Sequence, residues 1–204
     1  MVVNNFQLIE EYMDSHPCKE GEFHFLQIIQ RNKENPNLGS NNHVIREYMV
    51  ENSEYLEKHK NEIITLCELF NARAYTHISK KTYKDVGFQV LNTLAEYLSQ
   101  ENYHGVKHLY STSVGRCKSS DKTFLVDIDT KEKEFVNECI NCINIYCQPF
   151  DNIHKVVLTV PTLHGYHLIT TPFDLGAFSK LHPNIDVHKN NPTLLYYYEK
   201  RLLA

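Results

Sequence analysis

The stretch FLVDIDT, from Phe124 to Thr130, places two aspartates inside a segment whose other residues are typical of a buried strand. Successive strand residues point to opposite faces, so Asp127 and Asp129 lie side by side on one face. Neighbouring carboxylates repel each other unless a cation or a shared proton offsets their charge. We therefore expect a strand over Phe124–Ile128 whose end holds a divalent metal ion. The alternative is a solvated strand end with an aspartate that caps the following helix.

Apolar spacing along the chain predicts an α+β fold, with a mixed β-sheet and flanking helices. The predicted strands cover Phe23–Arg31, His43–Val50, Ala72–Ser79, Leu109–Gly115, Phe124–Ile128, Val156–Val160, Tyr166–Thr170 and the LLYYY segment that ends at Tyr198. The predicted helices cover Asn4–Met13, Glu54–Phe70, Tyr83–Leu98, the segment around Phe135–Cys147, and Phe173–Leu181.

Charge is distributed unevenly over the 204 residues, which are enough for one domain with a substantial core. Residues 1–70 carry a net charge of −6, residues 71–123 of +4, and residues 124–204 of −2. We expect a single domain, 1–204, in which an acidic subdomain 1–70 precedes a catalytic core 71–204. The basic third is where a nucleic-acid template would bind, although a locally basic segment also arises by chance.

The sequence shows no signal for membrane insertion or export. No apolar run approaches the ~20 residues of a membrane span, so we expect no membrane partner. The first residues lack the basic start and apolar stretch of an export signal. Six cysteines without such a signal favour a reducing cytoplasm over a disulfide framework.

Two other segments carry residues suited to metal and phosphate chemistry. The turn TLHGYHLIT, Thr162–Thr170, presents His164 and His167 beside a glycine, and NIDVHK places Asp186 between two apolar residues. Mg²⁺ and Mn²⁺ take oxygen ligands and leave positions open for phosphates, while a histidine and backbone N–H groups can hold a phosphate tail. Each of these residues also has an ordinary structural explanation, as a hydrogen-bonded sheet histidine or a turn aspartate.

The three segments in this order resemble the motifs of the archaeo-eukaryotic primase superfamily, which includes the primase-polymerases of phages and mobile elements. Its first motif, a strand ending in Asp-x-Asp, is matched by Asp127-Ile-Asp129. Its second, roughly Ser-Gly-x-Gly-x-His, is matched by Thr162-Leu-His-Gly165-Tyr-His167, with Thr in place of Ser and Leu163 in place of the first glycine. Its third, an aspartate between apolar residues, is matched by Ile185-Asp186-Val187.

The resemblance implies a primase-like core that contains an RNA-recognition-like sheet, and a nucleotidyltransferase that joins nucleotides to a nucleic-acid end. It implies that Asp127, Asp129 and Asp186 are catalytic and hold Mg²⁺ or Mn²⁺. It also implies that His167 binds the triphosphate of a nucleoside triphosphate, with Thr162, His164 and Gly165 in the same turn. A replicative role would need a separate helicase, because the chain has no helicase part.

One residue outside these motifs is expected beside them. Arg73 lies with Tyr75 and His77 on one face of the strand Ala72–Ser79, and this face could line the nucleotide cleft. A solvated face is the alternative for all three.

Two other functions and one other metal site remain open from the sequence. The chain could be a catalytically inactive primase-like protein that binds nucleic acid or nucleotides. FLVDIDT also fits the start of a haloacid-dehalogenase-like phosphatase, with Asp127 as nucleophile and Asp129 as general acid, but the Rossmann-like unit of that fold has little room in the 75 residues after Asp129. Finally, Cys139, Cys142, Cys147 and His154 have the residue types of a zinc site. We expect these cysteines instead to be buried structural residues, since two fall on the apolar stripe of a helix.

Overall fold

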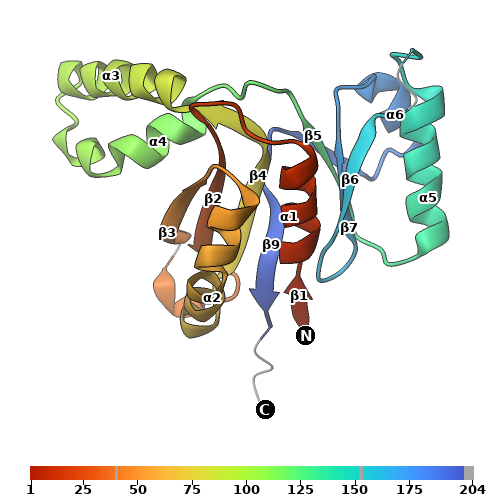
Figure 1. Cartoon of the computed structure of the whole chain (residues 1–204), viewed down its shortest axis with the longest axis horizontal. Coiled ribbons are helices and arrows are strands. Elements are labelled where there is room, and N and C mark those ends of the chain that lie inside the picture. Colours follow the sequence, from red (N-terminus) through yellow and green to blue (C-terminus); the bar gives the residue numbers. More distant parts are fainter. Residues whose placement is uncertain (40, 152–153, 200–204) are drawn as a thin grey trace.

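The computed structural model describes residues 1–39, 41–151 and 154–199 and has an α+β fold. Its described residues form two antiparallel sheets and six α-helices (Figure 1). Among these residues, no helix combines the length and the apolar character that crossing a membrane requires.

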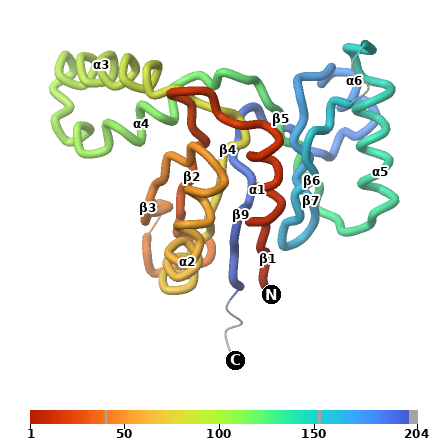
Figure 2. The backbone as a smooth tube through the Cα atoms, viewed as in Figure 1, coloured from red at the N-terminus to blue at the C-terminus, as the bar shows by residue number. Residues whose placement is uncertain are grey.

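The larger sheet has five strands in the order β1-β9-β4-β2-β3, which are Val2–Asn4, Thr193–Tyr198, Arg73–Thr82, Glu22–Gln30 and His43–Val50. The first and last strands of the chain therefore lie side by side (Figure 2). Side chains of β4 alternate as predicted, because Ala74, Thr76 and Ile78 are buried whereas Arg73 and Tyr75 are only partly buried. This one sheet contains strands from residues 1–70 and from residues 71–204, the two parts that the sequence predicts as an acidic subdomain and a catalytic core.

Helices α1 (Phe6–Ser15) and α2 (Ser53–Phe70) pack on the buried face of this sheet. Helix α2 starts where the Asn52 side chain accepts a 2.8 Å hydrogen bond from the Tyr55 N–H, and it ends at Asn71 with φ of 48°. Helices α3 (Tyr83–Ser99) and α4 (Leu109–Arg116) lie together at one end of the molecule, joined through a 3₁₀ helix, Tyr103–His108 (Figure 1). A shorter 3₁₀ turn, Pro36–Leu38, lies between β2 and β3.

The smaller sheet has four strands in the order β6-β7-β5-β8, which are Val156–Pro161, Tyr166–Thr170, Phe124–Ile128 and Asp186–Lys189. Helix α5 (Lys133–Asn141), continued by a π-helical turn (Cys142–Tyr146), follows β5, and α6 (Leu175–Leu181) follows β7. Both helices cover one face, where Val126, Ile128 and Leu168 pack against apolar residues such as Val136, Ile143 and Phe178. On the other face Leu125, Val160 and Ile169 join the core of the larger sheet, so the two sheets share one core.

Two predictions about secondary structure are wrong, and two short strands were missed. The sheet is not mixed, since every strand pairing among the described residues is antiparallel. Leu109–Gly115 is not a strand but lies in α4, whose buried residues Ser113, Val114 and nearby Cys117 have helical spacing and pack against Phe23, Phe25 and Val86. Strands β1 and β8 were not predicted, because both are short and mostly exposed.

Candidate active site between the two sheets

The three predicted aspartates lie at one end of β5, where Asp127 and Asp186 share a face. In the antiparallel register, Asp127 of β5 stands directly opposite His167 of β7 and opposite Asp186 of β8. Directly opposite residues of paired strands share a face and lie close together. His167, Asp127 and Asp186 therefore form a row across the sheet. Asp129 follows two residues later, just past the end of the strand. The fold therefore brings together residues that are up to 59 positions apart in the sequence.

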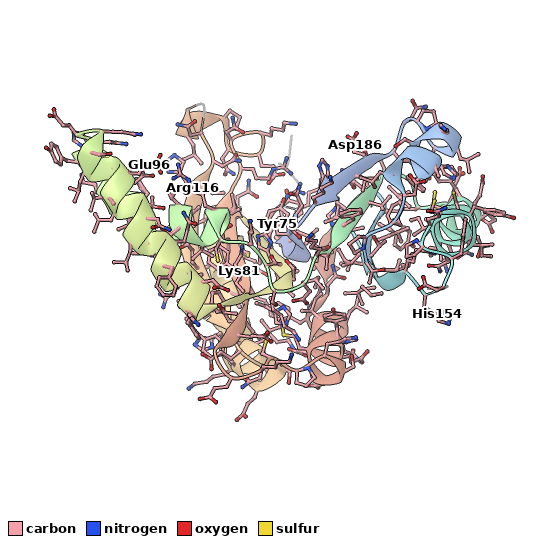
Figure 3. All side chains as sticks on the ribbon, turned by 90° about the horizontal axis from the view of Figure 1, so that it is seen from above. Tyr75, Lys81, Glu96, Arg116, His154 and Asp186 are labelled. Carbon is pink, nitrogen blue, oxygen red and sulfur yellow. The ribbon has the colours of Figure 1, made fainter. Side chains whose placement is uncertain are left out.

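Two cavities meet at Asp127 and Asp129. The smaller, of about 230 Å³, also contacts Asp186 and lies between the end of β5 and Phe135 of α5. The larger, of about 720 Å³, lies between the two sheets. It is lined by Thr162, His164 and His167 on one side and by Arg31, Lys33, Glu34, Arg73 and Tyr75 on the other. Figure 3 shows Tyr75 near the middle of the molecule and Asp186 on the strand that extends beyond it.

Asp127 is held in its charged form by a histidine. His167 Nε2 lies 3.4 Å from Asp127 Oδ1, while His167 Nδ1 lies 2.9 Å from the hydroxyl of buried Thr193 in β9. The hydrogen bond from His167 lowers the pKa of Asp127, although partial burial opposes the shift. The repulsion between neighbouring carboxylates expected from the sequence therefore does not dominate at Asp127. Thr193 orients the histidine, and the histidine stabilises the carboxylate.

Gly165 allows the β6–β7 turn to pack directly against the end of β5. A Cβ atom at this position would lie 1.7 Å from the Ile128 carbonyl oxygen and 2.8 Å from the Thr130 nitrogen. Thr162 closes the turn, because its hydroxyl accepts a 3.0 Å hydrogen bond from Gly165 N–H and its own N–H donates to the Gly165 carbonyl at 2.9 Å. The glycine is required here by close backbone approach and not by a positive φ.

Leu163 explains why this turn departs from the glycine-rich pattern. Its side chain is buried beside Val3, Leu194 and Tyr197 of the larger sheet. A glycine at this position would remove that anchor, so the leucine attaches the turn to the opposite wall of the larger cavity. His164 is exposed beside it and lines the same cavity.

The opposite wall is formed by cations that surround one carboxylate. Glu34 Oε1 lies 2.5 Å from Arg73 Nη2 and 3.8 Å from Arg31 Nη1, and the Arg73 guanidinium lies 4.2 Å from the centre of the Tyr197 ring. The pair is incompletely bonded, because Arg73 Nε and Glu34 Oε2 are buried without a hydrogen-bond partner. Such groups are costly, and a ligand with several acceptor oxygens could satisfy Arg73 better than Glu34 does.

The residues at the end of β5 have the chemistry that Mg²⁺ and Mn²⁺ prefer. Mg²⁺ is commonly held by one or two carboxylates together with substrate phosphates, and Asp127, Asp129 and Asp186 all line the smaller cavity. Within residues 1–39, 41–151 and 154–199, however, no three or more His, Cys, Asp or Glu side chains are grouped closely enough to hold a metal ion. The described carboxylates therefore do not form a complete protein cage for a metal ion, and a cation here would need further ligands such as phosphate oxygens.

The structure separates the predicted site residues into three positions. Asp127 and Asp129 line both cavities, with Asp186 in the smaller and His167 in the larger. Thr162, Gly165 and His164 form the adjoining turn, and Arg73 lies on the opposite wall. Sequence reasoning missed Glu34, Arg31, Lys33 and His188, which also line the larger cavity, and it missed Thr193 behind His167. His188 could have been found by alternation from Asp186 had β8 been recognised as a strand. The loop residues carried no pattern that pointed to the cavity.

Three of the cysteines are buried as predicted. Cys139, Cys142 and Cys147 are buried in the core beside α5 and α6, and burial raises the pKa of each thiol, to about 11 for Cys139 and Cys147. All six cysteines are free. His154 is exposed, in the loop before β6.

Comparison with protein-family models, with curated proteins and with solved structures finds no match to this chain. The function must therefore be argued from the geometry of the site.

Proposed function

We propose that this protein is a primase-polymerase-like nucleotidyltransferase, which joins nucleotides from a nucleoside triphosphate to a nucleic-acid end with Mg²⁺ or Mn²⁺. The observation that carries the proposal is the row His167–Asp127–Asp186 across three neighbouring strands, with Asp129 beside it. These residues belong to the three motifs of the resemblance, and the fold brings them to one end of one sheet. A chance match of short motifs does not require them to be neighbours.

The topology of the smaller sheet supports the proposal. Its elements follow the order β-α-β-β-α-β, and its strands lie in the order fourth, first, third, second along the sheet. We interpret this unit, β5 to β8 with α5 and α6, as the RNA-recognition-like part of a primase-like core. In this interpretation the first strand carries the first two aspartates and the fourth carries the third. The same topology disfavours the phosphatase alternative, because β5 pairs only with antiparallel neighbours and not within a Rossmann-like parallel sheet.

Each residue then has a role that its environment supports. Asp127 and Asp129 would hold the metal, with Asp186 beside them, and Mg²⁺ or Mn²⁺ supplies activation of the attacking oxygen and neutralisation of the leaving pyrophosphate. His167, held by Thr193, donates from Nε2 to an anionic oxygen, which is that of Asp127 in this structure. Arg73 would exchange its contact with Glu34 for phosphate oxygens, which offer a guanidinium two parallel hydrogen bonds.

A second candidate function is a catalytically inactive protein that binds nucleotides or nucleic acid. The absence of a ready-made three-ligand metal group among the described residues favours it. A nucleic-acid template would also meet both signs of charge, since several acidic side chains lie close to the cations in the larger cavity. Binding without incorporation would distinguish this function from the enzyme.

The test is extension of a labelled primer on a template with nucleoside triphosphates and Mn²⁺ or Mg²⁺. We expect incorporation by the wild-type protein and at least a ~100-fold loss in Asp127→Asn, because the amide keeps the size but not the charge that holds a hard cation. Asp151→Asn is the matched control, since Asp151 is an exposed carboxylate outside both cavities. A wild-type protein that binds labelled nucleotide but incorporates none would support the binding function. Equal activity in Asp127→Asn would contradict the proposed site.

A further inference from the structure

Helix α3 has an apolar stripe on the face that points away from the protein. Its inner face buries Val86 and Thr93, yet the large side chains of Phe88, Leu91 and Leu98 are 59%, 62% and 51% exposed. With Ala95 they follow the spacing i, i+3, i+7 and i+10, which places all four on one side of a helix. A helix with apolar residues on two opposite sides normally has both sides covered. In this chain one side of α3 is open.

This stripe lies far from the candidate active site in the fold. Figure 1 shows α3 and α4 at one end of the molecule and the sheet of β5 to β8 at the other. Figure 3 shows Glu96 and Arg116 beside α3 and α4, and the 2.6 Å ion pair between them links the two helices away from the stripe. The apolar face is therefore presented on a supported helix, and it has no role in the proposed chemistry.

We propose that a second copy of this chain packs antiparallel against the exposed stripe of α3, forming a two-fold symmetric dimer. A two-fold axis on the outer side of α3, at the level of Thr93 along the helix, pairs each residue with a partner equally far on the other side. Phe88 then faces Leu98 of the second copy, and Leu91 faces Ala95, so a large side chain meets a small one at the centre. A symmetric interface requires such self-complementarity, because the same patch must serve both partners.

The charges at the ends of the stripe support the same arrangement. Lys84 is exposed at the start of α3 and Glu101 is exposed just after its end, and neither has an ion-pair partner among the described residues. Antiparallel pairing brings Lys84 of each copy to the region of Glu101 in the other, whereas parallel pairing brings like charges together. A nucleic-acid partner fits this face less well, because the stripe itself is apolar and Lys84 is its only cation.

The expected dimer is weak. One face of a 17-residue helix is small for a specific interface, and interfaces with less than ~1,200 Å² of total buried area are typical of transient complexes. We therefore expect an association that depends on concentration in the micromolar range. Sedimentation of the full chain over a hundredfold range of concentration should show the mass rise from monomer to dimer.

Two sets of variants test the geometry. Leu91→Glu should remain monomeric throughout, whereas Leu181→Glu, the same change at a 61% exposed leucine of α6, should associate like the wild type. Lys84→Glu and Glu101→Lys should each weaken association at low salt, and the double variant should restore it. Unchanged circular dichroism would show that each variant folds.

The proposal is overturned if the wild-type chain stays monomeric, if Leu181→Glu dissociates the dimer as strongly as Leu91→Glu, or if the double charge exchange restores nothing. A monomeric wild-type protein whose template binding is lost in Leu91→Glu would assign the stripe to nucleic acid instead. Primer extension is measured in parallel and should be unaffected by Leu91→Glu, so failure of the dimer and failure of the proposed enzyme are separable.

Discussion

The two sheets face each other across the larger cavity, and they differ in which ionisable side chains stay charged. On β5, the hydrogen bond from His167 lowers the pKa of Asp127 and keeps its carboxylate charged. On β4, burial and the nearby Lys81 charge lower the pKa of His77 to about 4, so that this histidine is neutral. Only at Arg73 does β4 carry a charge at the cavity, and Glu34 balances it. The wall at β5 thus keeps carboxylates available, while on the opposite wall Glu34 pairs with Arg73 and Arg31.

This difference locates the chemistry on β5 and gives β4 a supporting part. The end of β5 joins a turn and two neighbouring strands, so side chains from three elements meet there. Strand β4 lies in the middle of a sheet with helices on its other face, and its side chains are more deeply enclosed. A polar group can remain charged where its neighbours supply the opposite charge, and it becomes neutral where they do not. The predictions below test each wall separately.

The largest expected effect comes from Gly165→Ala, which disrupts the contact between the β6–β7 turn and the end of β5. The added methyl group would overlap the Ile128 carbonyl, so either the turn or the end of β5 must move. We expect a loss of about 3 kcal/mol in the free energy of unfolding, measured by chemical denaturation, together with lost nucleotide binding. Gly115→Ala in α4 is the control, since nothing lies within 4 Å of its new methyl group, and it should be neutral or stabilising by up to about 1 kcal/mol. Equal destabilisation in the two variants would contradict the close contact.

The next effect is on acid stability and concerns His77 of β4. A histidine whose folded pKa lies below its unfolded value of about 6.5 takes up protons on unfolding, so stability falls as the pH drops from 6.5 toward the folded pKa. For His77 that window runs down to about pH 4, and the loss is on the order of 3 kcal/mol. Asp127 acts in the same direction but in a lower pH window, because its lowered pKa adds stability that is retained above about pH 4 and lost as the pH falls further.

His77→Gln should therefore flatten the pH dependence of the free energy of unfolding between pH 6.5 and 4. The difference between variant and wild type isolates this one residue from the other titrating groups. His164→Gln is the matched control, since His164 is exposed, and its pH dependence should follow the wild type. Identical slopes in His77→Gln and wild type would show that His77 is not held neutral.

Much of this fold follows from local patterns in the sequence, whereas the site depends on the pairing of strands. The strand Phe124–Ile128 has the predicted bounds because apolar residues alternate between two buried faces. That Asp127 stands between His167 and Asp186 depends on register, which local patterns do not encode. Strand β8 escaped prediction because only Val187 among its four residues is even partly buried. Arg31 and Glu34 lie in a loop, and only the position of the smaller sheet makes them part of a cavity.

The smallest effect distinguishes Arg73 from Glu34, the two partners of an ion pair that lines the larger cavity. In the proposed function Arg73 binds phosphate, while Glu34 occupies the same guanidinium when no ligand is bound. Arg73→Gln should weaken binding of a nucleoside triphosphate by about tenfold, since a hydrogen bond to a charged group contributes about 1.5–3 kcal/mol. Glu34→Gln should strengthen it by roughly threefold, because Arg73 no longer has to leave a charged partner.

The opposite signs are what make the experiment decisive, and the measurement is titration with a fluorescent nucleoside triphosphate at fixed Mn²⁺. Arg46→Gln is the matched control, because Arg46 of β3 forms a 3.2 Å ion pair with Glu62 of α2, outside both cavities. It should leave affinity unchanged. If Arg73→Gln and Glu34→Gln both weaken binding to the same extent, then the pair only supports the fold of the β2–β3 loop. In that case the two walls differ in structure but not in their roles toward a ligand, and the phosphate contacts must come from the His164–His167 turn alone.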